Sequence, residues 1–138
     1  MELIITVAIT GIVASVLGTV IYQMVTVGEY GGARLIATHE LQNAAYWLNM
    51  DGQTAVSAVG GTDLTLTMAD ASTVTYSVGG RRLRRVSSGP PLTMAQNVTA
   101  ASFSVSGRVV TIDLTSAPQG RTGVSEQGTY VVTMRAAP

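Results

Sequence analysis

The side chains of this sequence that could take part in catalysis are few and isolated. His39 is the one histidine, and the chain contains no cysteine, so no thiolate or second imidazole is available to bind a metal. The sequence also lacks a Ser, His and Asp arrangement, a phosphate-binding glycine loop and a carboxylate pair with catalytic spacing. We therefore expect a protein that is not an enzyme and has no cofactor or metal, with His39 as an ordinary residue on a helix surface.

The main cluster of charge is a run of arginines, Arg81, Arg82, Arg84 and Arg85, which holds half of the eight basic residues. Strand alternation places Arg82 and Arg84 on one face and Arg81 and Arg85 on the other. The favoured interpretation of this basic patch is a solvated sheet edge that resists strand addition. Contact with acidic residues of a neighbouring subunit comes second. Nucleic-acid binding comes last, because no aromatic side chains are interleaved to stack on bases.

Glu2 stands directly before a long apolar stretch, since residues 3–28 carry no formal charge. An acid at this position has two interpretations. It complements the positive end of a helix dipole at a membrane surface, or it becomes buried in an assembly and must meet a positive partner there. The residues themselves leave both interpretations open.

Residues 3–28 are long enough to cross a membrane as a helix. At about 1.5 Å per residue they extend about 39 Å, against about 30 Å for the hydrocarbon core of a bilayer. Small residues interrupt the apolar surface and would let another helix approach closely. These helix-packing residues are Gly11, Ala14, Ser15 and Gly18.

After residue 28 the pattern becomes amphipathic without a clear helix stop signal. Polar and apolar residues recur with helical spacing as far as Asp51. We predict one helix over about residues 2–51, about 75 Å long, whose first half must project because a core of this size could not bury it. Gly28, Gly31 and Gly32 each cost up to about 1 kcal/mol relative to alanine, so a bend or short melted stretch is expected there.

The rest of the chain is rich in Thr, Ser, Val and Gly and alternates with the period of a strand. Gly79-Gly80 predicts a two-residue hairpin turn that places Tyr76 opposite Leu83, and Ser106-Gly107 predicts a second turn. A long loop is expected over residues 116–128. The expected strands cover residues 64–68, 74–78, the segment around Leu83, 99–106, 108–115 and 129–135.

The predicted fold is therefore α+β, with a long protruding N-terminal helix packed at its C-terminal half on a small antiparallel β-meander. We divide the chain into a hydrophobic membrane-spanning helix (1–28), an amphipathic helix packed on the globular part (29–53) and an antiparallel β domain (54–138).

The composition supports a chain divided into an apolar helix and a polar, weakly charged β domain. Of 138 residues, 46% are hydrophobic and 12% are charged, and the formal net charge is zero. The charged fraction is about half that of an ordinary soluble domain, which argues against a plain soluble enzyme. A chain without net charge is also poorly suited to holding nucleic acid by bulk electrostatics.

The N-terminal segment resembles the N-terminal helix of type IV pilins and pseudopilins. The matching residues are Glu2, the apolar segment 3–13, Gly11, Ala14 and Ser15. The resemblance is specific over residues 1–30, and the plan of a helix followed by a meander extends it over the rest of the chain.

The resemblance implies a structural subunit of a type IV pilus or related filament, cut by a prepilin peptidase and N-methylated. The subunit would wait in the cytoplasmic membrane, be extracted by the inner-membrane assembly platform, and polymerise with copies of itself into an extracellular surface filament. Glu2 would then pair with the N-terminal ammonium of a neighbouring subunit. The alternatives are a minor pilin or type II secretion pseudopilin, and a monomeric membrane-anchored domain that binds a partner.

Overall fold

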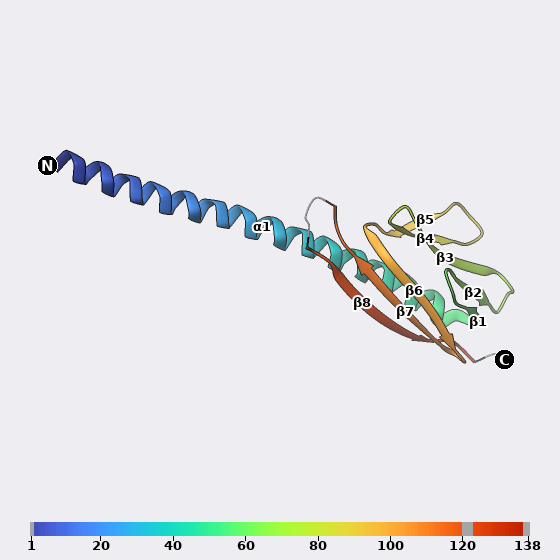
Figure 1. Ribbon diagram of the computed structural model, residues 1–138. Helices are drawn as coiled ribbons and strands as arrows, with labels where there is room; N and C mark the ends of the chain where they lie inside the picture. The colour runs from blue at the N-terminus through green and yellow to red at the C-terminus, as the bar shows by residue number, and fades with distance from the viewer. Residues whose placement is uncertain (1, 120–122, 137–138) are drawn as a thin grey trace.

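The computed structural model describes residues 2–119 and 123–136, which form one helix and eight strands in two antiparallel sheets (Figure 1). The helix, α1 (Glu2–Thr54), projects at its N-terminal end far beyond the strands, which pack against one face of its C-terminal part (Figure 1). This arrangement confirms the predicted α+β fold with a protruding N-terminal helix.

Helix α1 is a single uninterrupted element, about 80 Å long at 1.5 Å per residue. It passes through Gly28, Gly31 and Gly32 without a break, so the melted stretch expected at these glycines is not present. Glu29, Ala33 and Arg34, which have good helix propensity, stand beside the glycines and help to sustain the backbone hydrogen bonds across them. The helix also ends at Thr54, slightly beyond the predicted end at residue 51.

The first sheet, sheet A, is a five-stranded meander in chain order. The sequence pattern predicted its second, third and fourth strands but not the short strands at its two edges. Its members are β1 (Ala55–Val59), β2 (Leu64–Met68), β3 (Thr73–Gly79), β4 (Arg82–Val86) and β5 (Leu92–Ala95).

The second sheet, sheet B, is a three-stranded meander of β6 (Val98–Ser106), β7 (Val109–Ser116) and β8 (Glu126–Thr133). Strand β8 begins earlier than the predicted strand 129–135, so the connection after β7 is shorter than the expected loop. Gly128 pairs with Leu114 inside β8, and the ring of Tyr130 lies over it, where an added Cβ would come within 2.5 Å of the Tyr130 hydroxyl. A glycine that looked like a loop residue is thus part of the sheet.

The β3–β4 hairpin differs from the prediction in register. The loop residues are Gly80 and Arg81, with φ of 58° and 61°, which is the pair of positive values that a type I′ turn requires. Leu83 therefore pairs with Val78, and the residue opposite Tyr76 is Arg85 rather than Leu83.

Tertiary contacts hold Arg81 in this left-handed conformation. Its guanidinium donates to the carbonyl of Ala117, and its own carbonyl accepts from the backbone N–H of Val98. The β6–β7 turn is also displaced by one residue from the prediction, since Ser106 pairs with Val109 and leaves Gly107 and Arg108 as the loop.

The hydrophobic core lies where α1 meets both sheets. The helix contributes one stripe with a spacing of three or four residues, which is the pattern of a helix that buries a single face. The stripe consists of Ala37, Leu41, Ala44 and Leu48, followed by Asp51 and Gly52. Leu64, Leu66, Tyr76, Leu83, Phe103, Ile112 and Leu114 from the two sheets are buried against it. At Gly52 the helix comes so close to β8 that an added Cβ would lie 2.6 Å from Cγ1 of Val132.

Candidate functional site

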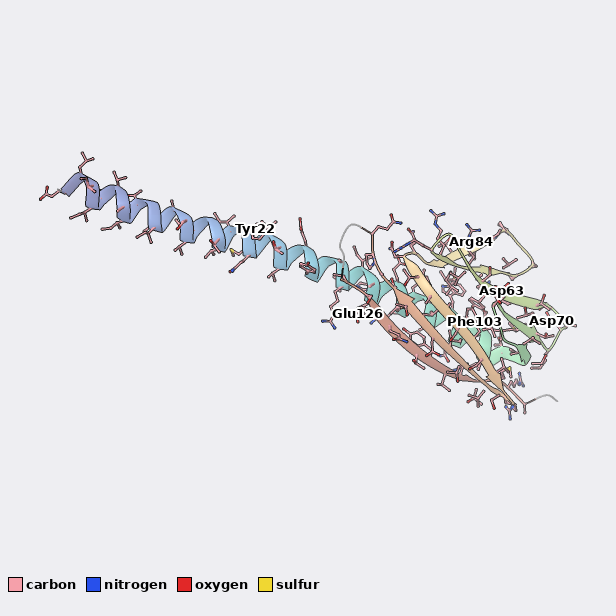
Figure 2. All side chains as sticks on the ribbon, in the orientation of Figure 1. Tyr22, Asp63, Asp70, Arg84, Phe103 and Glu126 are labelled. Carbon is pink, nitrogen blue, oxygen red and sulfur yellow. The ribbon has the colours of Figure 1, made fainter. Side chains whose placement is uncertain are left out.

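The most unusual surface of the protein is the exposed apolar surface of the projecting half of α1. Its large apolar side chains are exposed from Leu3 (77%) to Val27 (70%), and Tyr22 points into open space on the same segment (Figure 2). An 18-residue window of this helix is apolar enough to span a membrane, and 0% of it is buried in the structure. The protein therefore presents one long apolar rod that its own β-sheets leave uncovered.

The threonine and serine hydroxyl groups on this rod already donate within the helix. Thr6 donates to the Glu2 carbonyl, Thr10 to that of Thr6, and Thr19 to that of Ser15. Such bonds to the preceding turn let a helix carry Ser and Thr into an apolar environment without unpaired polar atoms. The rod is thus suited to lipid or to a dry protein core.

The predicted helix-packing residues all lie on this exposed rod. Gly11 and Gly18 each have open space where a Cβ would stand, and the hydroxyl of Ser15 donates to Ile12 rather than outward. Ala14 lies between the glycines and is also exposed. The structure leaves this face available to another helix.

Glu2 occupies the first turn of α1 and is exposed. Within residues 2–119 and 123–136, no basic side chain forms an ion pair with it.

The other end of the helix is fixed by a buried polar cluster of Asp51, Arg85 and Tyr76. Asp51 is 8% exposed and accepts a bidentate pair of hydrogen bonds from Arg85, with Nε 2.6 Å from Oδ2 and Nη2 2.9 Å from Oδ1. The hydroxyl of Tyr76, a fully buried residue, also donates to Oδ2. The Arg85 guanidinium lies 5.3 Å from the ring centroid of Trp47, one helical turn before Asp51. The cluster therefore ties α1 to β3 and β4.

This cluster shifts the pKa values of its members. Burial, followed by the hydrogen bond to Asp51, raises the pKa of Tyr76 well above its ordinary value of 10.0, so the phenol stays protonated as a donor. The hydrogen bond to Asp51 raises the pKa of Arg85, although burial opposes the shift. Both shifts favour the protonated donors that the Asp51 carboxylate needs.

The helix also covers the free edge of β5. The side-chain amide of Asn43 donates to the carbonyl of Met94 at 2.6 Å, and the Glu40 carboxylate accepts from the backbone N–H of Gln96. Edge strands with unpaired backbone groups invite further strand pairing. Side chains of α1 thus block sheet growth at this edge.

The structure divides the four arginines of the basic patch. Arg85 belongs to the Asp51 cluster, and Arg81 is bound to Ala117. Arg82 and Arg84 are exposed, and Arg84 lies on the outer side of the β domain (Figure 2). Only Arg82 and Arg84 therefore present an exposed side chain. The expected sheet edge at this patch is wrong, because β4 pairs with β3 on one side and with β5 on the other.

His39 is exposed beside a groove between α1 and β5. Among the described residues no group of His, Asp and Glu side chains is arranged to hold a metal ion.

Sequence reasoning did not identify the cluster of Asp51, Arg85 and Tyr76. One signal was present, because Asp51 follows Leu48 by three residues and so falls on the buried face of the helix. A charged residue on that face needs a partner. Arg85 could be identified as that partner only once the register of the β3–β4 hairpin was known.

Comparisons of this chain with protein-family models, curated proteins and solved structures find no match. The fold and the exposed rod define an α+β protein with a projecting apolar N-terminal helix, an architecture compatible with a pilin-like subunit.

We predict that Asp51→Ala lowers the free energy of unfolding by about 3 kcal/mol, because it leaves Arg85 without its carboxylate and Tyr76 without its acceptor. The measurement is urea unfolding of the full chain in detergent micelles, followed by the fluorescence of Trp47. The matched control is Asp63→Ala at an exposed position, which should change stability by less than about 0.5 kcal/mol. Equal stabilities of the two variants would show that the cluster does not hold the helix.

The raised pKa of Tyr76 predicts a loss of stability in alkali. Below pH 10 the phenol is neutral in both states. Above pH 10 the Tyr76 phenol ionises in the unfolded chain but stays protonated in the folded one. The free energy of unfolding of the wild type should therefore be about 1.4 kcal/mol lower at pH 11 because of this group. Tyr76→Phe should remove that loss when unfolding is measured from pH 8 to 11. Burial also raises the pKa of Tyr130, but this contribution is the same in the wild type and in the variant. Identical pH profiles would contradict the assignment.

Proposed function

We propose that this protein is a structural subunit of a type IV pilus or related filament. One observation carries the proposal, namely that the apolar half of α1 is uncovered over its whole length in the described structure. In the membrane, lipid would cover this surface. In a filament, the same surface would pack against the helices of other copies, so a subunit could move from one apolar environment to the other with its backbone hydrogen bonds intact.

Three further features support assembly over a solitary anchor. Gly11, Ala14 and Gly18 would let neighbouring helices come close where lipid gives no hydrophobic driving force. The net charge of zero removes the repulsion that many like-charged copies would suffer. Glu2 would be buried in such a core and paired with the N-terminal ammonium of a neighbour, which would set the register between subunits.

The proposal includes the partners that the pilin resemblance implies. These are a prepilin peptidase, an inner-membrane assembly platform and other copies of this chain, with the cytoplasmic membrane as the site before assembly and the cell surface as the site after it. A minor pilin or pseudopilin would share the same architecture and differ in abundance within the filament. A monomeric membrane-anchored binding domain would form no filament.

The experiment is to shear cells that express the chain, image the supernatant by electron microscopy and identify the subunit by mass. Filaments composed mainly of a 14.3 kDa chain indicate a major pilin, and trace amounts indicate a minor one. A sheared fraction without the chain, together with a monomeric chain in the membrane, would contradict the proposal.

We predict that Glu2→Ala blocks or strongly slows filament formation, because the neighbour's ammonium would be buried without its carboxylate, at a cost of about 3–5 kcal/mol. Membrane insertion should be unchanged, since an apolar residue replaces a charged one. Asp63→Ala, which removes an exposed carboxylate of the β domain, should assemble normally. Wild-type amounts of filament from the Glu2 variant would remove Glu2 from the mechanism.

A further inference from the structure

The second half of α1 has an exposed surface without formal charge. Within residues 35–54, all of which the structure describes, the two carboxylates of Glu40 and Asp51 are bound to the β domain. None of the exposed residues of this segment is Asp, Glu, Lys or Arg, and they include Leu35 (59% exposed) and Tyr46 (60% exposed). A helix surface that faces water normally carries charged residues, and exposed apolar surface marks an interaction site. This surface is therefore suited to a partner without charge.

One line of exposed residues joins this surface to the rod. It follows alternating steps of three and four residues along α1, beginning at Ile4 and passing through Gly18 to Gln53, and we call it the α1 seam. Every residue of the seam is exposed, and none is Asp, Glu, Lys or Arg. Grooves lie on both sides of its second half, where α1 meets β5 and β8, and the described strands leave the seam uncovered. A repeat of 3.5 residues keeps two parallel helices in contact along a gentle left-handed supercoil.

The two halves of the α1 seam have complementary side-chain sizes. In the rod it carries a small set, which consists of Gly11, Ala14 and Gly18. In the second half it carries a large set with the same spacing, which consists of His39, Gln42 and Tyr46. Each member of the large set stands 28 residues after its counterpart in the small set. Large side chains of one helix fit against small residues of another and let the two backbones come close, so the small set matches the large set of a second copy.

The size of the β domain permits this match. A displacement of 28 residues corresponds to about 42 Å along the helix axis and is a whole number of heptads, so the seams of the two copies stay in register. The β domain lies beside the C-terminal part of α1 (Figure 1), with contacts from Arg34, paired with Glu126, to Gly52, beside Val132. These contacts extend over about 27 Å of the helix, less than the displacement. The β domain of the displaced copy would therefore lie beyond the first one and leave its rod free to reach the seam.

We propose that the second half of the α1 seam binds the rod of a second copy of this chain, with the small set of that rod against the large set. Residues 3–28 of the incoming rod bring no formal charge, which suits the uncharged seam. The contact joins two different surfaces, so each copy can receive one rod and offer its own, and repetition gives an open filament. The inference rests on the proposed function and names the surface that receives the rod. A rod has several neighbours in a bundle, so this contact is separate from the one at Glu2.

The first test exchanges side-chain size across the contact. Gly18→Leu should lower the yield of sheared filaments about tenfold, because the added side chain would meet Tyr46 of the neighbour. Gly18 has no atom within 4 Å of an added Cβ, so this variant should be found in the membrane in normal amounts. Tyr46→Ala makes room for the leucine and should restore most of the yield in the double variant.

The matched control is Gly11→Leu combined with Tyr46→Ala. Its added side chain would face His39 of the neighbour, so the double variant should assemble as poorly as Gly11→Leu alone, and His39→Ala should rescue it instead. Equal rescue of Gly11→Leu and Gly18→Leu by Tyr46→Ala would overturn the inferred register.

Disulfide cross-linking reads the contact directly, since the chain contains no cysteine. Copies with Gly18→Cys and copies with Tyr46→Cys are expressed together, and the sheared filaments are oxidised with iodine, which enters apolar regions. A disulfide-linked heterodimer is expected. Gly18→Cys with Gln53→Cys, about 10 Å further along the seam, should give none.

The outcomes separate this inference from the proposed function. Filaments that contain the chain but give no heterodimer of positions 18 and 46 would overturn the inference and uphold the proposed function. A disulfide between Tyr46→Cys and Arg84→Cys copies would show that a β domain covers the seam, and it would also overturn the inference. Absence of filaments from the wild type would contradict the proposed function itself.

Discussion

The apolar surface of residues 3–27 must be kept from water, and no other part of the described chain covers it. Each Val, Leu or Ile moved from water into an apolar environment contributes about 1.5–3 kcal/mol, so this surface largely determines where the protein can exist. The internal hydrogen bonds of Thr6, Thr10 and Thr19 make the same helix acceptable to lipid and to a protein core. The fold of the β domain serves to present this helix without burying it.

The buried cluster at the other end of α1 fixes the helix to the β-sheets. Asp51 joins the helix to β3 and β4 through Tyr76 and Arg85, and Glu40 and Asn43 cover the edge of β5. A helix held by both packing and directional bonds keeps a fixed rotation relative to the sheets. In a filament, that rotation would decide which faces of neighbouring β domains meet.

Much of the architecture could be predicted from the sequence, because long apolar and amphipathic patterns have few structural solutions. The helix end and the central strands followed from such patterns, whereas β1 and β5 are too short to show a clear period. The β3–β4 register was wrong because the contacts of Arg81 with Ala117 and Val98, distant in sequence, select the turn. That register brings Arg85 to Asp51, 34 residues away, so no local pattern could reveal the pair. The projecting first half of the helix was predicted, and Glu2, Gly11 and Gly18 lie on it, while their role in assembly is a proposal.

The most direct test of the central claim measures whether the apolar rod is shielded from water both in the membrane and in the filament. In this cysteine-free chain, single cysteines at Val16 on the rod and at Arg84 on the β domain can be probed with a membrane-impermeant maleimide. The account predicts that position 16 is unreactive in intact membranes and in sheared filaments and reactive only after they are dissociated, whereas position 84 reacts throughout. Rapid labelling of position 16 in the sheared material would show that water reaches the rod and would contradict the account.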